Sequence, residues 1–138
     1  MQDNENGGGF STPLAKEDSI DLIKWMARQA AGHGMAIGLK NALSIIEDVV
    51  DVVDFAVNEE CVDWKECSEM RPFIEAGKPV FHIEYPEGAG SNGGLGSGNL
   101  GEYCNASGTD GFSTVIKNDN LDGWVQYCDG SVNSTEMS

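Results

Sequence analysis

The stretch FAVNEECVDWKEC, residues 55–67, changes character within a few positions. It opens on apolar side chains typical of a buried strand, and Asn58, Glu59 and Glu60 then end the apolar run. Short runs that are apolar throughout are typical of parallel sheets, whose strands are buried on both faces. The stretch therefore predicts a buried strand with carboxylates at its carboxyl end, followed by a loop between two cysteines.

The segments on both sides alternate between two hydrophobic patterns. Some carry apolar residues at helical spacing, which predicts helices at 16–33, 43–53 and 68–76. Others are apolar throughout, which predicts strands at 35–39, 54–57, 79–83 and 112–116. Such alternation indicates an α/β fold with a parallel sheet covered by helices. We also expect a flexible Gly and Ser loop at 86–101 and a short helix near 121–125.

The composition is strongly acidic. The 138 residues include 8 Lys and Arg against 23 Asp and Glu, which gives a formal net charge of −15. Such a charge repels a nucleic-acid backbone and an anionic membrane face, and it favours either a cationic partner or a well-solvated surface. Because the sequence lacks a run of roughly 18 or more apolar residues, it predicts no membrane insertion.

The cysteines indicate the compartment. They form an even set without a CxxC pair or a neighbouring histidine: Cys61, Cys67, Cys104 and Cys128. We therefore expect disulfides formed in an oxidising, extracellular compartment, and neither a metal site nor a cofactor. The glycosylation sequons at 105–107 and 133–135 agree with secretion. Since MQDNENGGG lacks the pattern of a signal peptide, we expect the signal to lie upstream, in a longer precursor.

Polar side chains follow each predicted strand. They are Lys40 and Asn41, then Asn58, Glu59 and Glu60, then Glu84 and Tyr85, then Lys117 and Asn118. The carboxyl ends of parallel strands share one rim, where substrate sites of α/β proteins lie, although loops are polar in any case. Glu59 and Glu84 are the acid and base candidates, because a carboxyl at a strand end in a partly apolar cleft can have its pKa raised toward neutrality. Glycoside hydrolysis needs two such groups facing each other, and spacing alone does not show that these two form that pair. Lys40 would keep a carboxylate charged, bind substrate or simply be solvated.

Three other features give weaker signals. The glycine-rich segment 94–98 lacks the GK[ST] ending of a phosphate-binding loop. His33 and His82 lack the cysteine or carboxylate spacing of a metal site and fit helix-end and strand-packing roles. Ser113 stands outside a GxSxG turn, so a serine nucleophile has no support.

Taken in order, four segments resemble a known family. They are GLKNAL (38–43), DFAVNEEC (54–61), ECSEMRPFIEAGKPVFHIEY (66–85) and GFSTVIK (111–117). Together they resemble glycoside hydrolase family 114, the endo-α-1,4-polygalactosaminidases, over most of residues 9–128. The resemblance implies a secreted enzyme with a (β/α)₈ TIM barrel that hydrolyses α-1,4-linked galactosamine polymers.

On this resemblance the chain is the C-terminal half of such a barrel. Its four βα units would be strands 5–8, carried by a partial glycoside hydrolase domain at 16–128. Residues 1–15 would be a loop remnant from the missing half, and 129–138 a flexible tail. A half-barrel leaves sheet edges open, so we expect the isolated chain to dimerise, aggregate or fold poorly.

The resemblance also assigns roles. It places the catalytic glutamate on Glu59, and many members have Gln where this chain has Glu60, which is therefore not the second catalytic group. We expect the sugar subsites to be lined by Lys40, Asn41, Asn58, Glu84 and Tyr85. The family's second carboxylate is an Asp in a PDN-like motif. Asp3 and Asn4 look similar, but we expect the true Asp upstream, so the chain alone would lack it.

The resemblance further pairs Cys61 with Cys67 and Cys104 with Cys128. It also supplies a cationic partner, because a deacetylated galactosamine polymer is polycationic and an acidic cleft would raise its local concentration. The rival hypothesis is a non-catalytic, degenerate half-barrel that binds amino sugars without cutting them.

Overall fold

The computed structural model describes residues 14–91 and 93–136. Its centre is a six-stranded sheet in the order β1 to β6, with bounds Gly38–Lys40, Phe55–Glu59, Val80–Glu84, Ser113–Lys117, Trp124–Tyr127 and Val132–Ser134. Strands β1 to β4 are parallel, β5 runs antiparallel to β4, and β6 runs antiparallel to β5. The α/β class is confirmed, and the sheet is mixed rather than wholly parallel.

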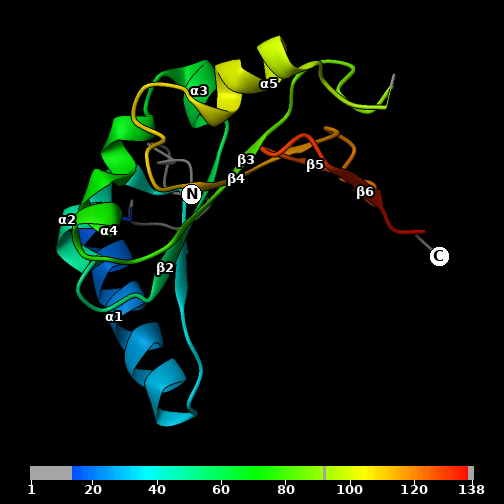
Figure 1. Ribbon diagram of the computed structural model, residues 1–138. Helices are drawn as coiled ribbons and strands as arrows, with labels where there is room; N and C mark the ends of the chain where they lie inside the picture. The colour runs from blue at the N-terminus through cyan, green and yellow to red at the C-terminus, as the bar shows by residue number, and fades with distance from the viewer. Residues whose placement is uncertain (1–13, 92, 137–138) are drawn as a thin grey trace.

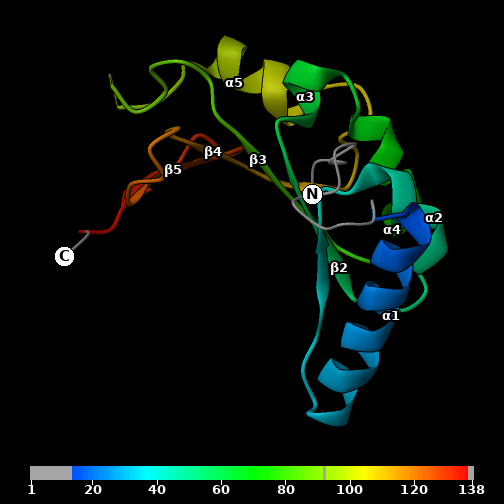
Figure 2. The same cartoon turned by 180° about the vertical axis from the view of Figure 1, so that it is seen from behind.

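Helices connect the parallel strands. The bounds are α1 Lys16–Gly32, η2 Leu43–Ile45, α2 Ile46–Val49, α3 Cys61–Trp64, η3 Cys67–Met70, α4 Arg71–Glu75 and α5 Ser97–Cys104. Helices α1, α2 and α4 lie together on one side of the sheet (Figures 1 and 2). Among the helices of the described ranges, none is long and apolar enough to cross a membrane.

The main core lies between these helices and the sheet. It joins Val49 of α2 and Phe73 of α4 to Ala56 of β2 and Val80 of β3, all of them fully buried. Side chains alternate between the two faces along a strand, so every second residue of β2 and β3 must point to the other side. The burial pattern of β2 shows this alternation directly.

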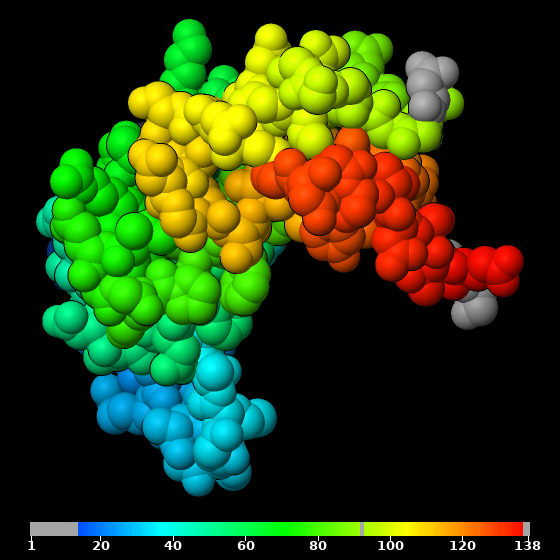
Figure 3. Space-filling model, viewed as in Figure 1, coloured from blue at the N-terminus to red at the C-terminus, as the bar shows by residue number. Residues whose placement is uncertain are grey.

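The other face of the parallel strands is more open. Phe55 and Phe81 lie on it with ring centroids 5.7 Å apart, and Phe81 is 44% exposed. The Phe55 ring also lies over Gly38, where an added Cβ would come within 2.2 Å of it. Figure 3 shows the curvature of the molecule as a broad hollow between the N-terminal elements in blue and the C-terminal strands in red.

Two of the predicted helices differ from the structure. The helix expected at 43–53 ends at Val49, because Asp54 donates its amide to Ile37 (2.8 Å) rather than back to Val50. Lys78 Nζ then donates to the carbonyls of Val50 (2.5 Å) and Val53 (2.6 Å), which completes the turn. The expected helix near 121–125 is wrong: β5 occupies that position.

The pairing with β4 explains β5. Val125 lies opposite Lys117, and Gln126 lies opposite Ile116. Buried Trp124 and Gln126 alternate with more exposed neighbours, which is the period of a strand.

The C-terminal third is also more ordered than the sequence predicted. Helix α5 begins at Ser97, inside the segment expected to be a loop. Residues 132–134 of the predicted tail form strand β6, although all three are exposed. Most of the predicted loop remnant, residues 1–13, lies outside the described residues.

Candidate active site at the strand ends

Three side chains meet on the open face where β1, β2 and β3 end. Glu59 lies between the other two: its Oε2 forms an ion pair with Lys40 Nζ, and its Oε1 accepts a hydrogen bond from the Tyr85 hydroxyl (2.7 Å). The sequence predicted all three as site residues, and the structure brings them together. We call Lys40, Glu59 and Tyr85 the rim cluster.

The backbone after β1 helps to position the rim cluster. Asn41 and Ala42 follow β1 with left-handed φ values of 51° and 52°, which turn the chain sharply at the rim. Asn41 Oδ1 then accepts a hydrogen bond from the amide of Glu59 (3.1 Å). The predicted residue Asn41 therefore contacts the backbone of Glu59 and fixes the position of its amide group.

The surroundings of Glu59 keep it ionised. Burial alone would raise its pKa, but the hydrogen bonds from Lys40 and Tyr85 and the charge of Lys40 outweigh burial, and the pKa lies below its ordinary value of 4.5. Burial and the bond to Glu59 raise the pKa of Tyr85, which therefore stays protonated and donates. The rim cluster presents a carboxylate held by one cation and one phenol.

Two predicted site residues lie on the opposite face. Asn58 and Glu84 directly precede Glu59 and Tyr85 in their strands, and the alternation of a strand turns them toward the helix side. Asn58 is 1% exposed and Glu84 is 0% exposed. Neither side chain lines the open face, so the structure does not place them at the position expected for sugar-binding residues.

Glu84 instead belongs to a buried polar group. Its Oε1 lies 2.7 Å from His82 Nε2 and accepts the amide of Val62 (2.8 Å). On the other side of the ring, His82 Nδ1 lies 3.0 Å from Thr114 Oγ1. We call His82, Glu84 and Thr114 the buried triad. His82 thus has the strand-packing place expected for it, while Thr114 was missed because a lone threonine in a strand carries no signal.

Both predicted disulfides are present. Cys61 is bonded to Cys67 and Cys104 to Cys128. In the described ranges, the one group with metal-ligand spacing is Cys61, Cys67 and His82. Because its two sulfurs are bonded to each other, this group offers no thiolate to a cation.

The polar residues at the end of β4 form hydrogen bonds within neighbouring loops. Lys117 Nζ donates to the carbonyl of Asp122 (2.5 Å), and Asn118 donates to the carboxylate of Asp122 (2.9 Å). Asn118 also accepts the amide of Gly90 (2.9 Å). These bonds hold loops together, and in the described part of the chain neither residue forms a hydrogen bond or ion pair with the rim cluster.

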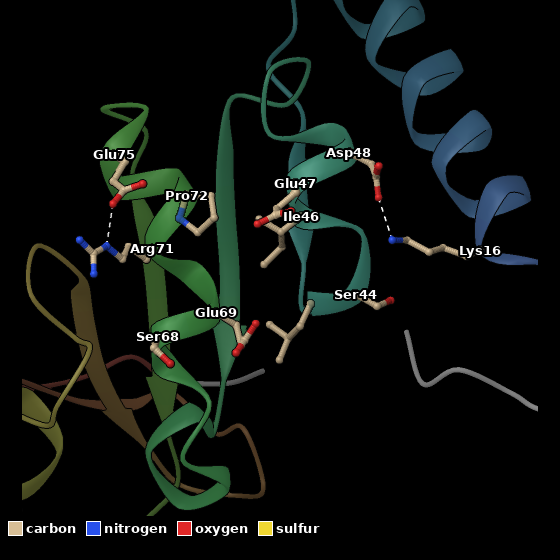
Figure 4. A pocket seen from close by; sticks show the side chains of 11 residues that line it. Lys16, Ser44, Ile46, Glu47, Asp48, Ser68, Glu69, Arg71, Pro72 and Glu75 are labelled. Atoms are coloured by element: carbon tan, nitrogen blue, oxygen red, sulfur yellow. Dashed lines mark hydrogen bonds and ion pairs between the residues drawn. The ribbon is translucent and has the colours of Figure 1, made fainter.

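The outer, helix side carries a separate hollow of about 600 Å³ (Figure 4). Its basic residues are already paired, Lys16 with Asp48 (2.9 Å) and Arg71 with Glu75 (2.6 Å). A smaller hollow of about 420 Å³ lies between α5 and the turn after β5. Neither hollow is lined by a residue of the rim cluster. The candidate active site is therefore the rim cluster at the strand ends and neither of these hollows.

Comparison with known proteins agrees with this geometry. The model of glycoside-hydrolase family GH114 matches residues 1–133. The crystal structure of Aspergillus fumigatus Ega3 in complex with galactosamine is similar, with 39% identity and a TM-score of 0.77. The alignment covers 91% of this chain and 51% of the Ega3 chain, so this chain spans about half the length of that relative. No curated protein sequence matches significantly.

The family match covers nearly the whole chain, and the structural match exceeds the level at which only a fold is shared. The family match includes the strand ends that carry Lys40, Glu59 and Tyr85. The chain belongs to glycoside hydrolase family GH114.

Proposed function

We propose that this chain forms part of a secreted endo-α-1,4-polygalactosaminidase, with Glu59 as one of its two catalytic carboxyl groups. The observation that carries the proposal is the rim cluster, in which Glu59 is ionised and partly exposed at the carboxyl end of a parallel strand. Family membership supports glycoside hydrolysis, and the galactosamine bound to Ega3 supports an amino sugar as substrate.

The electrostatics favour one role for Glu59. Glycoside hydrolysis needs a protonated carboxyl to donate to the leaving oxygen and a carboxylate to act as nucleophile or base. A general acid needs a raised pKa, whereas the pKa of Glu59 is lowered. Glu59 therefore takes the ionised role, and a second carboxyl donates the proton. The Asp3 alternative considered for that second group lies outside the described residues.

The other predicted residues divide into two groups. Lys40, Asn41 and Tyr85 lie beside Glu59 and contact the substrate or hold the carboxylate. Asn58 and Glu84 act from behind the sheet, because their side chains are buried on the helix side. The net charge of −15 would attract a polycationic galactosamine polymer over a distance of about 10 Å.

The open sheet face supports a larger architecture. Among the described residues, helices α1, α2 and α4 cover one side of the parallel strands, and the aligned relative is about twice as long. We therefore place β1 to β4 as four consecutive βα units of a (β/α)₈ barrel, whose interior would be the open face. On its own, the exposed face around Phe81 would promote self-association. Two disulfides fit the extracellular location.

The test is Glu59→Gln in the full-length protein, which contains both catalytic carboxyl groups, with Glu60→Gln as the matched control. Partly deacetylated galactosaminogalactan is the substrate, and released reducing ends are measured. Loss of Glu59 should lower turnover by about 10³-fold or more, because it removes a group that acts on the reacting atoms. Glu60 is exposed and should leave turnover within about two-fold. Equal turnover in the Glu59 variant and the wild type would remove the proposal.

A second candidate is an amino-sugar-binding protein without hydrolysis. It is favoured by the single carboxylate that the described residues place in the rim cluster. Binding of galactosamine oligomers by the wild type with no release of reducing ends would select this candidate.

A further inference from the structure

The segment after Glu59 is held in a costly conformation. Glu60 has a left-handed φ of 60°, and Lys65 has a φ of 59°, so the single turn of α3 lies between two unfavourable residues. Left-handed backbone is sterically unfavourable in residues other than glycine and persists only where the surroundings enforce it. The position of Glu59 therefore depends on what fixes this turn.

Glu84 supplies that fixation from inside the protein. Its Oε1 accepts the amide of Val62 in the first turn of α3 (2.8 Å), a donor that the short helix leaves free. His82 Nε2 lies 2.7 Å from this Glu84 oxygen and 3.3 Å from Cys61 Sγ. The buried triad thus contacts α3 at both Cys61 and Val62.

The end of β3 holds the end of β2 from both faces. Tyr85 reaches the carboxylate of Glu59 on the open face, while Glu84 reaches the backbone of α3 on the helix side. The main chain joins them between the faces, because Glu60 donates its amide to Ile83 (2.9 Å). Two consecutive residues of one strand therefore fix both the side chain of Glu59 and the turn that follows it.

Stability alone is a poor reason for this arrangement. His82 and Glu84 are both 0% exposed, and Glu84 Oε2 has no hydrogen-bond partner among the described residues. Replacing a buried ion pair by apolar side chains of similar volume is often neutral or stabilising. A fully buried carboxyl group with one unsatisfied oxygen is retained at a cost, which points to a use at the neighbouring site.

We propose that Glu84, oriented by His82 and Thr114, is a positioning residue that holds the Glu60–Val62 turn and thereby keeps Glu59 in its reactive place. The inference rests on the proposed function, because it gives Glu59 a catalytic task. Without the acceptor on Glu84, α3 loses a fixed point and Glu59 can shift relative to Lys40 and Tyr85. A misplacement of about 1 Å at a reacting group lowers the rate by about 10²-fold.

The experiment compares Glu84→Leu with Glu84→Gln in the full-length protein. The leucine removes the acceptor for Val62, so kcat should fall by about 10–100-fold with KM changed by less than about three-fold. The glutamine keeps a carbonyl oxygen that can accept the same amide, so it should recover most of the loss. The inference is overturned if the folded leucine variant keeps the wild-type kcat, or if glutamine fails to restore it.

A second pair of variants protects the test against misfolding of Glu84→Leu. Thr114→Val removes the hydroxyl that orients His82 and should lower kcat by roughly three- to ten-fold, whereas Thr114→Ser should restore it. Gln126→Leu is the control for buried polarity, since Gln126 is 3% exposed and bonds only Leu95 in the described part of the chain. It should lower the melting temperature without changing kcat.

A readout independent of activity separates this inference from the proposed function. Carbon-13 NMR titration of the Glu59 carboxyl follows its contacts with Lys40 and Tyr85 whether or not the protein hydrolyses sugar. In Glu84→Leu the pKa of Glu59 should move up toward its ordinary value, and amide exchange at Val62 should speed up. A catalytically silent wild type that shows these changes defeats only the proposed function, while unchanged titration and exchange defeat the positioning role.

Discussion

The two faces of the sheet differ sharply at the same strand ends. On the open face, Glu59 pairs with a lysine whose side chain is 60% exposed. On the helix side, Glu84 pairs with a histidine, and both side chains are fully buried. The carboxylates stand at the ends of neighbouring strands, yet one can meet a substrate and the other cannot. The difference teaches that the direction of a side chain decides its role here, and that its place along the strand does not.

The largest effect should come from breaking the buried pair. His82→Leu leaves Glu84 buried without its partner and should lower the free energy of unfolding by about 3–5 kcal/mol. Lys40→Met breaks the corresponding pair on the open face and should cost less than about 1 kcal/mol, because that lysine is largely solvated. Urea unfolding followed by circular dichroism measures both.

A double variant sharpens this contrast. Joining His82→Leu with Glu84→Leu removes both buried polar groups and should be less destabilising than His82→Leu alone. A double variant as unstable as the sum of its parts would show that an unpaired buried charge is not the cause.

The two disulfides should separate stability from activity. Cys104 and Cys128 close a span of 24 residues and Cys61 and Cys67 a span of 6, so loop entropy gives losses of about 3.5 and about 2.2 kcal/mol on removal. Only the smaller loop contains α3, next to Glu59. Paired Cys→Ser changes should therefore cost more stability at 104 and 128, but more turnover at 61 and 67.

Melting curves and hydrolysis rates on the same two preparations provide the check. If removal of the 104–128 bond reduced turnover as much as removal of the 61–67 bond, the turn after Glu59 would have no special importance.

The smallest effect should be a shift in the dependence of activity on pH. Because the pKa of Glu59 is lowered from 4.5, its charged form persists to more acidic pH than that of an ordinary glutamate. The stability that the charged form contributes is fully present above pH 4.5 and is lost as the pH falls through the lowered pKa. Lys40→Met removes a hydrogen bond and a positive charge while burial remains. The acid limb of kcat/KM should therefore move to higher pH.

Rates measured from about pH 3 to pH 7 test this expectation. Lys65→Met is the matched control, since Lys65 is exposed and forms no ion pair among the described residues. An acid limb that moves equally in both variants would assign the shift to net charge rather than to contact with Glu59.

Much of the parallel sheet could be predicted from the sequence because its strands are short, apolar and followed by polar residues. Grouping Lys40, Glu59 and Tyr85 at one rim succeeded for that reason. Grouping Asn58 and Glu84 with them failed, although the signal was present: neighbouring residues of a strand face opposite ways. The two-residue repeat of a strand places the side chains of residues 58 and 59 on opposite faces, and likewise those of residues 84 and 85.

Other features were beyond the reach of local patterns. The contact between Thr114 and His82 joins strands β4 and β3, and no local spacing predicts it. Strand β5 has only four residues, too few to show whether the period is that of a strand or a helix, and its pairing with β4 decides the matter. The same holds for the one-turn helix α3, which depends on the disulfide and on Glu84.

The antiparallel strand β5 determines at which edge of the parallel strands a further parallel strand can be added. Strand β4 is hydrogen-bonded on both edges, to β3 and to β5, whereas β1 is paired by the described residues on one edge alone. A further parallel strand can therefore join beside β1 without disturbing any pairing, but joining beside β4 requires β5 and β6 to be displaced first. In the proposed barrel, closure would therefore require an exchange of strands beside β4 and only the addition of a strand beside β1.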